Sequence, residues 1–167
     1  YFDNGYILFI GISFLFVGFI DLIHTLAYKG MGVYPGYNSD LPTQLWIAAR
    51  WLQALAFFAA TFFLDRKLNR PLVVLAGGTV VLILLFLSIF YWQTFPSCFV
   101  EGTGLTPFKI ASEYGISLIL LISIVPLMKK KDKLHPRVRQ LIIASILSTV
   151  ASEMSFTLYT DAYGFFN

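Results

Sequence analysis

The first residues in this sequence whose types and spacing could do chemistry are Asp21 and His24. They close the apolar stretch 7–20, and on a helix their three-residue spacing places both side chains on one face. An ionisable side chain is costly at membrane depth, so such a pair usually serves a ligand, a proton or a charged partner. A histidine is also a side chain that can supply or accept a proton.

Other ionisable residues also fall within or at the ends of long apolar stretches, namely Lys29, Arg50, Lys109, Glu113, Glu153 and Asp161. Lys109 and Glu113 are four residues apart and can pair along one helix, whereas Arg50 must find its carboxylate on another helix. A charge at bilayer depth costs at least about 2.5–3.5 kcal/mol, so these groups should face one another or a wet cavity. Polar and aromatic residues near them would suit a ligand pocket, among them Gln44, Trp46 and Tyr159.

The same residues also allow a purely structural interpretation. Buried ion pairs can fix helix register, and Trp and Tyr form the ordinary interfacial belts of membrane proteins. A metal site is a further alternative, with His24, Asp21 and Glu153 as its candidate ligands. The second histidine, His135, lies in a basic stretch, and no ligand spacing typical of a metal motif is present. The cofactor, if there is one, is unknown from the sequence.

The composition identifies the class of protein in which these residues must work. The 167 residues are 57% hydrophobic and 13% charged, whereas about 25% charged residues is usual for a soluble domain. The chain is long enough for about five membrane spans of roughly 20 residues each. The net charge of +3 does not indicate nucleic-acid binding, because the basic residues are grouped in two short stretches. The single cysteine, Cys98, excludes an intrachain disulfide and fits a small packed thiol.

We therefore predict an all-α fold, a polytopic transmembrane helical bundle that forms a single integral-membrane domain over 1–167. Apolar stretches of sufficient length predict spanning helices at about 6–27, 42–64, 71–92, 107–128 and 139–160. Prolines at 42, 71 and 107 fit the first turns of three of them. Spanning strands are not expected, because no stretch shows the alternating pattern of a barrel.

The basic residues predict the orientation of the helices. Nine of the twelve Lys and Arg residues lie in or beside the connections 65–70 and 129–138. By the positive-inside rule both connections are cytoplasmic, and the connections 28–41 and 93–106 are then extracytoplasmic. This orientation puts all the ionisable residues of the spans in the outer half of the plasma (inner) membrane. Because the number of spans is odd and the sequence begins at Tyr1, we expect flanking helices outside this fragment.

Four separated motifs in the chain resemble a known family. They are the stretches 19–33, which contains Asp21, His24 and Lys29; 41–50, which contains Gln44, Trp46 and Arg50; 104–114, which contains Lys109 and Glu113; and 152–159, which contains Glu153 and Tyr159. In this order they are similar to the third type of membrane-associated sensor domain of bacterial and archaeal signalling proteins.

The resemblance implies a sensory input module without enzyme activity of its own. In that family the module is fused in cis to cytoplasmic outputs such as histidine kinases of two-component systems, diguanylate cyclases and phosphodiesterases, often through a PAS domain. The motif residues are then the expected ligand-recognition set, without assigned chemistry. The resemblance does not supply the ligand.

Our leading hypothesis is a membrane sensor domain that binds a small or lipophilic signal in an outer-half polar pocket and relays it to a cytoplasmic output. Its partners are then the lipid bilayer, an unidentified small-molecule or lipid signal, the output domain and a possible second copy in a homodimer, with no nucleic acid. The alternatives are a small-solute or proton-coupled transporter, a membrane enzyme that uses His24 and a carboxylate, and a structural membrane anchor. Against the transporter, the charges do not continue into the cytoplasmic half.

Overall fold

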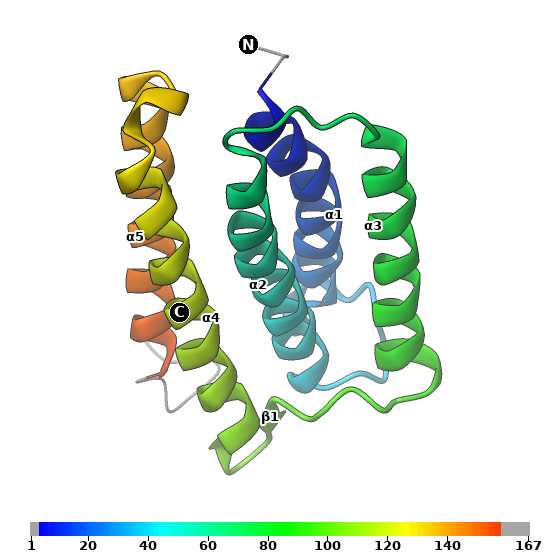
Figure 1. The fold of residues 1–167 in the computed structure, drawn as a ribbon. Coiled ribbons are helices and arrows are strands. Elements are labelled where there is room, and N and C mark those ends of the chain that lie inside the picture. The colour runs from blue at the N-terminus through cyan, green and yellow to red at the C-terminus, as the bar shows by residue number, and fades with distance from the viewer. Residues whose placement is uncertain (1–3, 158–167) are drawn as a thin grey trace.

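The computed structural model describes residues 4–157, and these form five long helices (Figure 1). They are α1 (Gly5–Ala27), α2 (Asp40–Ala60), α3 (Pro71–Phe86), α4 (Pro107–Lys129) and α5 (Pro136–Thr157). A 3-10 turn, η2 (Thr61–Phe63), extends α2, and a π turn, η3 (Leu87–Tyr91), extends α3. Each of the five is long and apolar enough to cross a membrane. The helical bundle predicted from the sequence is therefore confirmed.

The helix boundaries follow from local sequence. The Asn4 side chain caps α1 by accepting from the backbone N–H groups of Tyr6 (3.0 Å) and Ile7 (3.3 Å), and Thr106 caps α4 through the N–H of Lys109 (3.2 Å). The helices α3 and α4 begin at a proline, as predicted, since a first-turn proline lacks only an N–H that would have no helical partner.

Two predicted helix starts differ from the structure. The helix α2 begins at Asp40, two residues before the proline that marked it in the sequence, and α5 begins at Pro136 rather than Arg139. In both cases the helix begins a few residues earlier than predicted, because its first turn includes polar residues that precede the apolar stretch. The predicted end of the last helix, at residue 160, lies outside the described residues.

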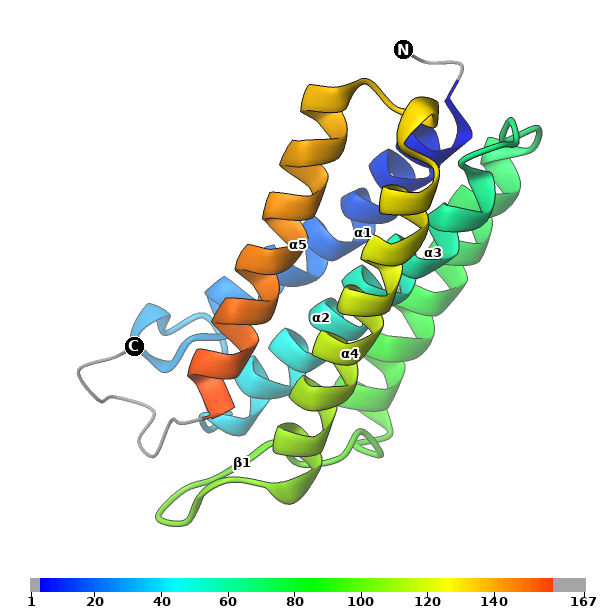
Figure 2. The ribbon, with the colours of Figure 1, turned by 60° about the vertical axis from the view of Figure 1, so that its left-hand side comes forward.

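The helices pack as a curved row in the order α3, α1, α2, α4, α5 (Figures 1 and 2). The central helix α2 packs against α1 on one side and α4 on the other, and it is the most buried of the five. Alanines on α2, among them Ala48, Ala49 and Ala54, are buried and permit this close approach. The two edge helices bury little: α3 has no buried residue, and α5 buries only Ile146 and Glu153.

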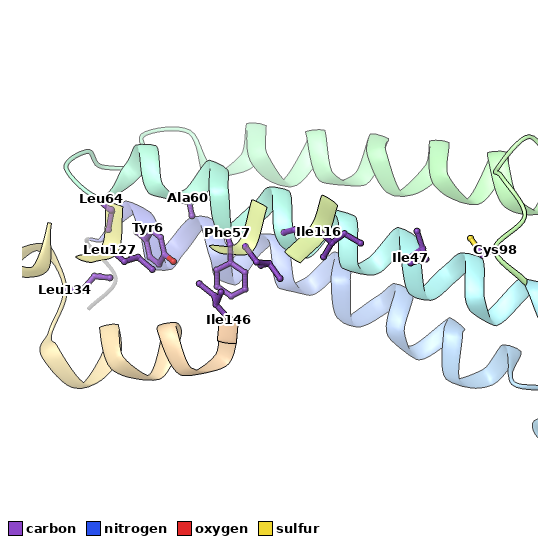
Figure 3. Packing of buried hydrophobic residues seen from close by; sticks show 12 residues of the cluster. Tyr6, Ile47, Phe57, Ala60, Leu64, Cys98, Ile116, Leu127, Leu134 and Ile146 are labelled. Atoms are coloured by element: carbon purple, nitrogen blue, oxygen red, sulfur yellow. The ribbon is translucent and has the colours of Figure 1, made fainter. Parts of the chain in front are cut away.

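The largest apolar cluster lies where α1, α2, α4 and α5 meet (Figure 3). Tyr6 from α1, Phe57 from α2 and Ile116 from α4 are each at most 3% exposed. From α5 this cluster receives Ile146, which is fully buried. A second cluster around Ile20, Leu45 and Ile89 joins α1 and α2 to the end of α3. Apolar packing therefore holds α5 at its middle, and a polar residue, Glu153, is buried two turns further along.

Both basic connections lie at the same end of the bundle, as the orientation argument requires. Asp65 of the α2–α3 connection forms ion pairs with Lys130 and with Lys133 (3.2 Å) of the α4–α5 connection. The two lysines hold the pKa of the Asp65 carboxyl below its usual value. The Asn4 amide also donates to the Lys133 carbonyl (3.1 Å), which attaches the start of α1 to the same end.

The opposite end contains the connection between α3 and α4, which includes a short antiparallel hairpin that we did not predict. Its strands are β1 (Phe99–Val100) and β2 (Gly104–Leu105). Two-residue strands show no alternating pattern long enough to recognise in a sequence. The turn uses Gly102 and Gly104, both at positive φ (84° and 92°), where a side chain would be strained.

Candidate functional site

Six of the residues singled out in the sequence form a polar cluster at the junction of four helices, which is buried at Lys109, Glu113 and Glu153 and partly exposed at Asp21. These are Asp21 of α1, Trp46 and Arg50 of α2, Lys109 and Glu113 of α4, and Glu153 of α5. Trp46 and Arg50 are one helical turn apart, as are Lys109 and Glu113, so α2 and α4 each present a pair of side chains on one face. We refer to this set as the polar cluster.

Arg50 joins α2 to α1 through its guanidinium group. One terminal nitrogen donates to both carboxylate oxygens of Asp21, at 2.5 and 2.6 Å, and the other donates to the side chain of Gln53. The guanidinium carbon lies 4.6 Å from the centre of the Trp46 ring, within cation–π range. Arg50 thus finds its carboxylate on another helix, as the sequence analysis predicted.

His24 lies at the edge of the cluster. Its Nδ1 is 2.7 Å from the Pro42 carbonyl oxygen, and because a carbonyl only accepts, Nδ1 carries a proton. The ring also packs against Trp46, with 5.4 Å between the ring centres. His24 therefore ties the end of α1 to the first turn of α2 and positions the indole of Trp46.

Lys109 and Glu113 form the predicted pair along α4, and both are almost completely buried. The Lys109 ammonium donates to Glu113 Oε1 and to the backbone carbonyl of Phe156 on α5 (3.3 Å). The Phe156 ring packs edge-on against Trp46, with 5.2 Å between the ring centres. Phe156 therefore joins the last turn of α5 to both α2 and α4.

Glu153 is the one carboxyl group of the cluster without a cation of its own. It is fully buried, and its oxygens have no close hydrogen-bond donor among the described residues, since the Trp46 indole approaches them only loosely. The groups that surround it are Glu113, Arg50, Lys109 and the Trp46 indole. Asp21 balances Arg50, and Glu113 balances Lys109, so with every member ionised the cluster carries one excess negative charge. A buried carboxylate of this kind must hold a proton or gain a partner.

Several other polar atoms of the cluster are also buried and unpartnered within the described residues. They are the donors Trp46 Nε1 and Arg50 Nε and the acceptor Glu113 Oε2. Buried polar groups are nearly always hydrogen-bonded, and each exception calls for a physical reason. Here donors and acceptors remain open together around Glu153, which is what a ligand with both kinds of group would satisfy.

The comparison with protein families agrees with this architecture. The family model MASE3, a membrane-associated sensor domain, matches residues 1–167, the whole chain. The chain belongs to this family. The resemblance found in the sequence is thus confirmed, and it gives this multi-pass membrane domain a sensory input role. No curated protein and no solved structure is detectably similar to the chain.

Two of the recognition residues expected for this MASE3 domain, Lys29 and Gln44, lie away from the cluster. Lys29 lies in the turn after α1 and pairs with Glu101 (3.3 Å), with both side chains more than half exposed. Gln44 donates to the carbonyl oxygens of Phe95 (3.1 Å) and Pro96 (3.2 Å), so it attaches α2 to the α3–α4 connection. Tyr159 lies outside the described residues. Ligand binding by the ten expected residues stays a prediction.

The sequence analysis missed Asp40, which organises the end of the MASE3 domain opposite the basic connections. Its Oδ1 accepts from the backbone N–H groups of Cys98 (2.7 Å) and Phe99 (2.8 Å), and its Oδ2 accepts from Ser97 Oγ (2.8 Å). Asp40 therefore fixes the α3–α4 connection onto the start of α2. An acidic residue in the first turn of a helix was the available signal, but its partners lie nearly 60 residues away.

The metal alternative has little support in this geometry. Among residues 4–157, no three His, Cys, Asp or Glu side chains converge as a metal site requires. Of the candidate ligands, Asp21 is taken by Arg50 and His24 Nδ1 by the Pro42 carbonyl.

Proposed function

We propose that this MASE3 domain senses a small or lipophilic molecule that binds at the polar cluster, and that it relays binding to a cytoplasmic output such as a histidine kinase or a diguanylate cyclase. The observation that carries the proposal is the state of Glu153, which is fully buried with both carboxylate oxygens unpartnered among the described residues. It is also one of only two buried residues on α5. A helix with so little burial has no structural need for a buried acid.

The chemistry of the cluster limits the ligand. It should donate a hydrogen bond to Glu153 and accept one from Trp46 Nε1 or Arg50 Nε, because these atoms are the open acceptors and donors. The rest of the surroundings is aromatic, so an amphipathic molecule with an amide, hydroxyl or protonated amine group fits best. Such a molecule could reach the cluster from the bilayer or from the aqueous side.

A relay requires that the ligand bind two arrangements of the helices with different affinity. The edge helix α5 is suited to move, because near Glu153 it is held by the Trp46–Phe156 ring contact and by the Lys109 hydrogen bond to the Phe156 carbonyl. A ligand hydrogen-bonded to Glu153 beside Trp46 would change these contacts. We infer that ligand binding displaces the last turns of α5 relative to α2 and α4.

Native mass spectrometry of the protein extracted in a mild detergent tests the site. We expect the wild type to retain a small bound mass, and Glu153→Gln and Arg50→Ala to lose it by about tenfold or more, since one lost charged hydrogen bond is worth about 1.5–3 kcal/mol. Glu101→Gln is the matched control, because it removes an exposed acid far from the cluster and should retain the mass.

Signalling by the protein that carries this domain provides the second readout. We expect Glu153→Gln and Arg50→Ala to lock the output in one state, whereas Glu101→Gln should respond as the wild type does. If folded Glu153→Gln and Arg50→Ala variants respond normally, the cluster is structural and the proposal is wrong. Flux of solute or protons through liposomes containing the domain would instead favour the transporter.

A further inference from the structure

A second candidate site lies at the end of the bundle that Asp40 organises. A cleft of about 530 Å³ opens between the start of α2, the turn η3 and the two connections that precede α2 and α4. We call it the α2–α3 cleft. It is separate from the polar cluster, and among the ten recognition residues expected from the sequence only Gln44 lines it.

Amide side chains from three different segments line the α2–α3 cleft. They are Asn38 before α2, Gln44 in α2 and Gln93 after η3. Gln44 uses its N–H groups on the Phe95 and Pro96 carbonyls, which leaves its amide oxygen as an acceptor. The Asn38 oxygen accepts from the Asp40 N–H (3.0 Å), which leaves the Asn38 N–H groups as donors. Together the amides therefore offer both donors and acceptors, which pair with hydroxyl groups or with another amide.

Gln93 has a further unusual property. Its φ of 52° is the single positive value at a non-glycine residue in the described chain. Such a conformation is sparsely populated by residues with a side chain, and strain of this kind is concentrated at binding and functional sites. The backbone after Gln93 is held in place, because the N–H groups of Thr94 (2.9 Å) and Phe95 (3.3 Å) both donate to the Ser88 carbonyl.

The charge of the cleft excludes anions. No Lys or Arg lines it, and its one charged residue is Asp40. The Asp40 carboxylate is already engaged by Ser97 Oγ and by the backbone N–H groups of Cys98 and Phe99, so it has little capacity left for a ligand cation. The lining that remains is neutral and rich in hydrogen-bonding groups.

An aromatic ring completes the wall of the cleft. Tyr37 is 40% exposed, and its ring is held by edge-on contacts with Tyr34 (6.3 Å between ring centres) and Phe90 (6.0 Å). A fixed aromatic face gives the C–H surface of a ligand an apolar platform while the tyrosine hydroxyl stays polar. An aromatic face beside planar amides is suited to a molecule that has C–H surface and many hydroxyl groups.

We propose that the α2–α3 cleft binds an uncharged, hydroxyl-rich small molecule, such as a sugar or polyol. The molecule could be a free solute or the sugar headgroup of a glycolipid, since both present the same hydroxyl groups. Binding itself does not rest on the sensor role proposed above, but its consequence for signalling does.

The hydrogen bonds around the cleft connect it to the polar cluster. Ser97, in the cleft wall, accepts from Thr106 Oγ through its carbonyl oxygen (2.7 Å), and Thr106 caps α4 at Lys109. A ligand against Ser97 and Phe95 therefore contacts the segment that leads directly into the Lys109–Glu113 pair. The cleft is placed to modulate the proposed signal at Glu153.

The test is equilibrium binding to the purified full chain in a sugar-free detergent, because alkyl glycosides would occupy a sugar site. The probes are glucose, galactose, trehalose and myo-inositol, with citrate, phosphate and choline as charged comparisons. Intrinsic fluorescence is a direct readout, since Trp92 adjoins Gln93. We expect at least one uncharged probe to bind saturably and the charged ones to be inactive.

Variants locate the binding. Gln93→Gly removes the amide and also relieves the backbone strain, and Asn38→Ala removes the amide before α2; each should weaken binding by about tenfold or more. Gln140→Ala is the matched control, because Gln140 is an exposed amide near the start of α5 and does not line the cleft. Binding of the free sugar in bilayer discs with and without a galactosyl diacylglycerol distinguishes the two sources. If the free sugar binds only in discs that lack the glycolipid, the glycolipid headgroup occupies the cleft.

The proposal is overturned if no uncharged probe binds, if only citrate or phosphate binds, or if Gln93→Gly and Asn38→Ala bind as the wild type does. None of these variants alters a residue of the polar cluster. Failure at the α2–α3 cleft would therefore leave the proposed sensing at Glu153 standing, and failure of the Glu153 and Arg50 variants would not affect the cleft.

Discussion

At the scale of single residues, the polar cluster shows how charges are accommodated at membrane depth. In two pairs the opposite charges neutralise each other: Lys109 and Glu113 along one helix, and Arg50 and Asp21 between two helices. Glu153 lies beside both pairs and belongs to neither. The pairs provide a polar environment in which an additional carboxyl group can be buried, and Glu153 is the group available to an incoming donor.

The Lys109–Glu113 pair should show strong energetic coupling. Lys109→Met leaves the Glu113 carboxylate buried without a cation, which we expect to destabilise the domain by about 3–5 kcal/mol. The double variant Lys109→Met with Glu113→Gln should recover most of this loss, because no uncompensated charge remains. Unfolding by denaturing detergent measures the stability of the wild type, of each single variant and of the double variant, which together form a double-mutant cycle.

The exposed pair Lys29–Glu101 is the control for this cycle. Exposed ion pairs contribute about 0–1 kcal/mol, so Lys29→Met and Glu101→Gln should be nearly additive and mild. Additive effects of Lys109→Met and Glu113→Gln would contradict the assignment of a buried, mutually dependent pair.

The Cys98 thiol reports on the hydrogen bonds that Asp40 makes. Cys98 is fully buried, and burial raises its pKa to about 12, with the nearby Asp40 carboxylate adding to the effect. The thiol therefore stays protonated and unreactive toward maleimides at neutral pH. Asp40→Ala releases the α3–α4 connection, and we expect labelling of this single cysteine to accelerate by about tenfold or more, as followed by mass spectrometry.

Glu101→Gln is again the matched variant, since it changes an acid in the same connection without touching the Asp40 contacts. It should label as slowly as the wild type. Rapid labelling of the wild-type protein would show that the connection is not held closed as described.

At the scale of elements, the bundle is held together by its central helices, and its edge helices are attached at few points. The contact of α3 with α1 is close at Gly78, where a Cβ atom would run into the ring of Phe16. The neighbouring Gly77 faces open space. The structure therefore distinguishes between these two adjacent glycines.

These adjacent glycines provide a sharp test of the α1–α3 contact. Gly78→Ala should destabilise the domain by about 1–3 kcal/mol, because Phe16 is buried and has little room to move aside. Gly77→Ala should be neutral or slightly stabilising, since alanine is the better helix former. Thermal unfolding of both variants in one detergent makes the comparison, and equal effects would contradict the packing.

At the scale of the whole molecule, the two ends of the bundle differ in chemistry. One end gathers the basic connections, which Asp65 holds together, and the other contains Asp40, the hairpin and the α2–α3 cleft. Because the lysines lower the Asp65 pKa, the stabilisation from these ion pairs is present above the ordinary value of 3.8 and is lost as the pH falls below it. At neutral pH the Asp65 carboxyl is therefore ionised and can pair with both lysines.

We also predict the orientation of these two ends in the membrane. In a Cys98→Ala background, Glu101→Cys should react with a membrane-impermeant maleimide from the outside of intact cells, and Lys131→Cys should react only after permeabilisation. Both positions are exposed, so access and not burial decides the result. The reverse pattern would place the basic connections outside and contradict the orientation.

The sequence by itself determined the helical membrane class, the number of spans in this chain, the grouping of the basic connections and most of the ionisable residues of the cluster. Hydrophobic length and helical spacing are local properties, so they can be read along the chain. The pairing of Lys109 with Glu113 was predictable for the same reason, since both residues lie on one helix.

Only the tertiary structure decided which residues meet across helices. The partner of Arg50, the isolation of Glu153, the contacts of Asp40 and the α2–α3 cleft all depend on how the five helices pack in a row. Lys29 matched a motif as well as Arg50 did, yet it lies in an exposed turn away from the cluster. The physical reason is that packing of apolar faces sets the order of the helices, and the polar contacts follow from that order.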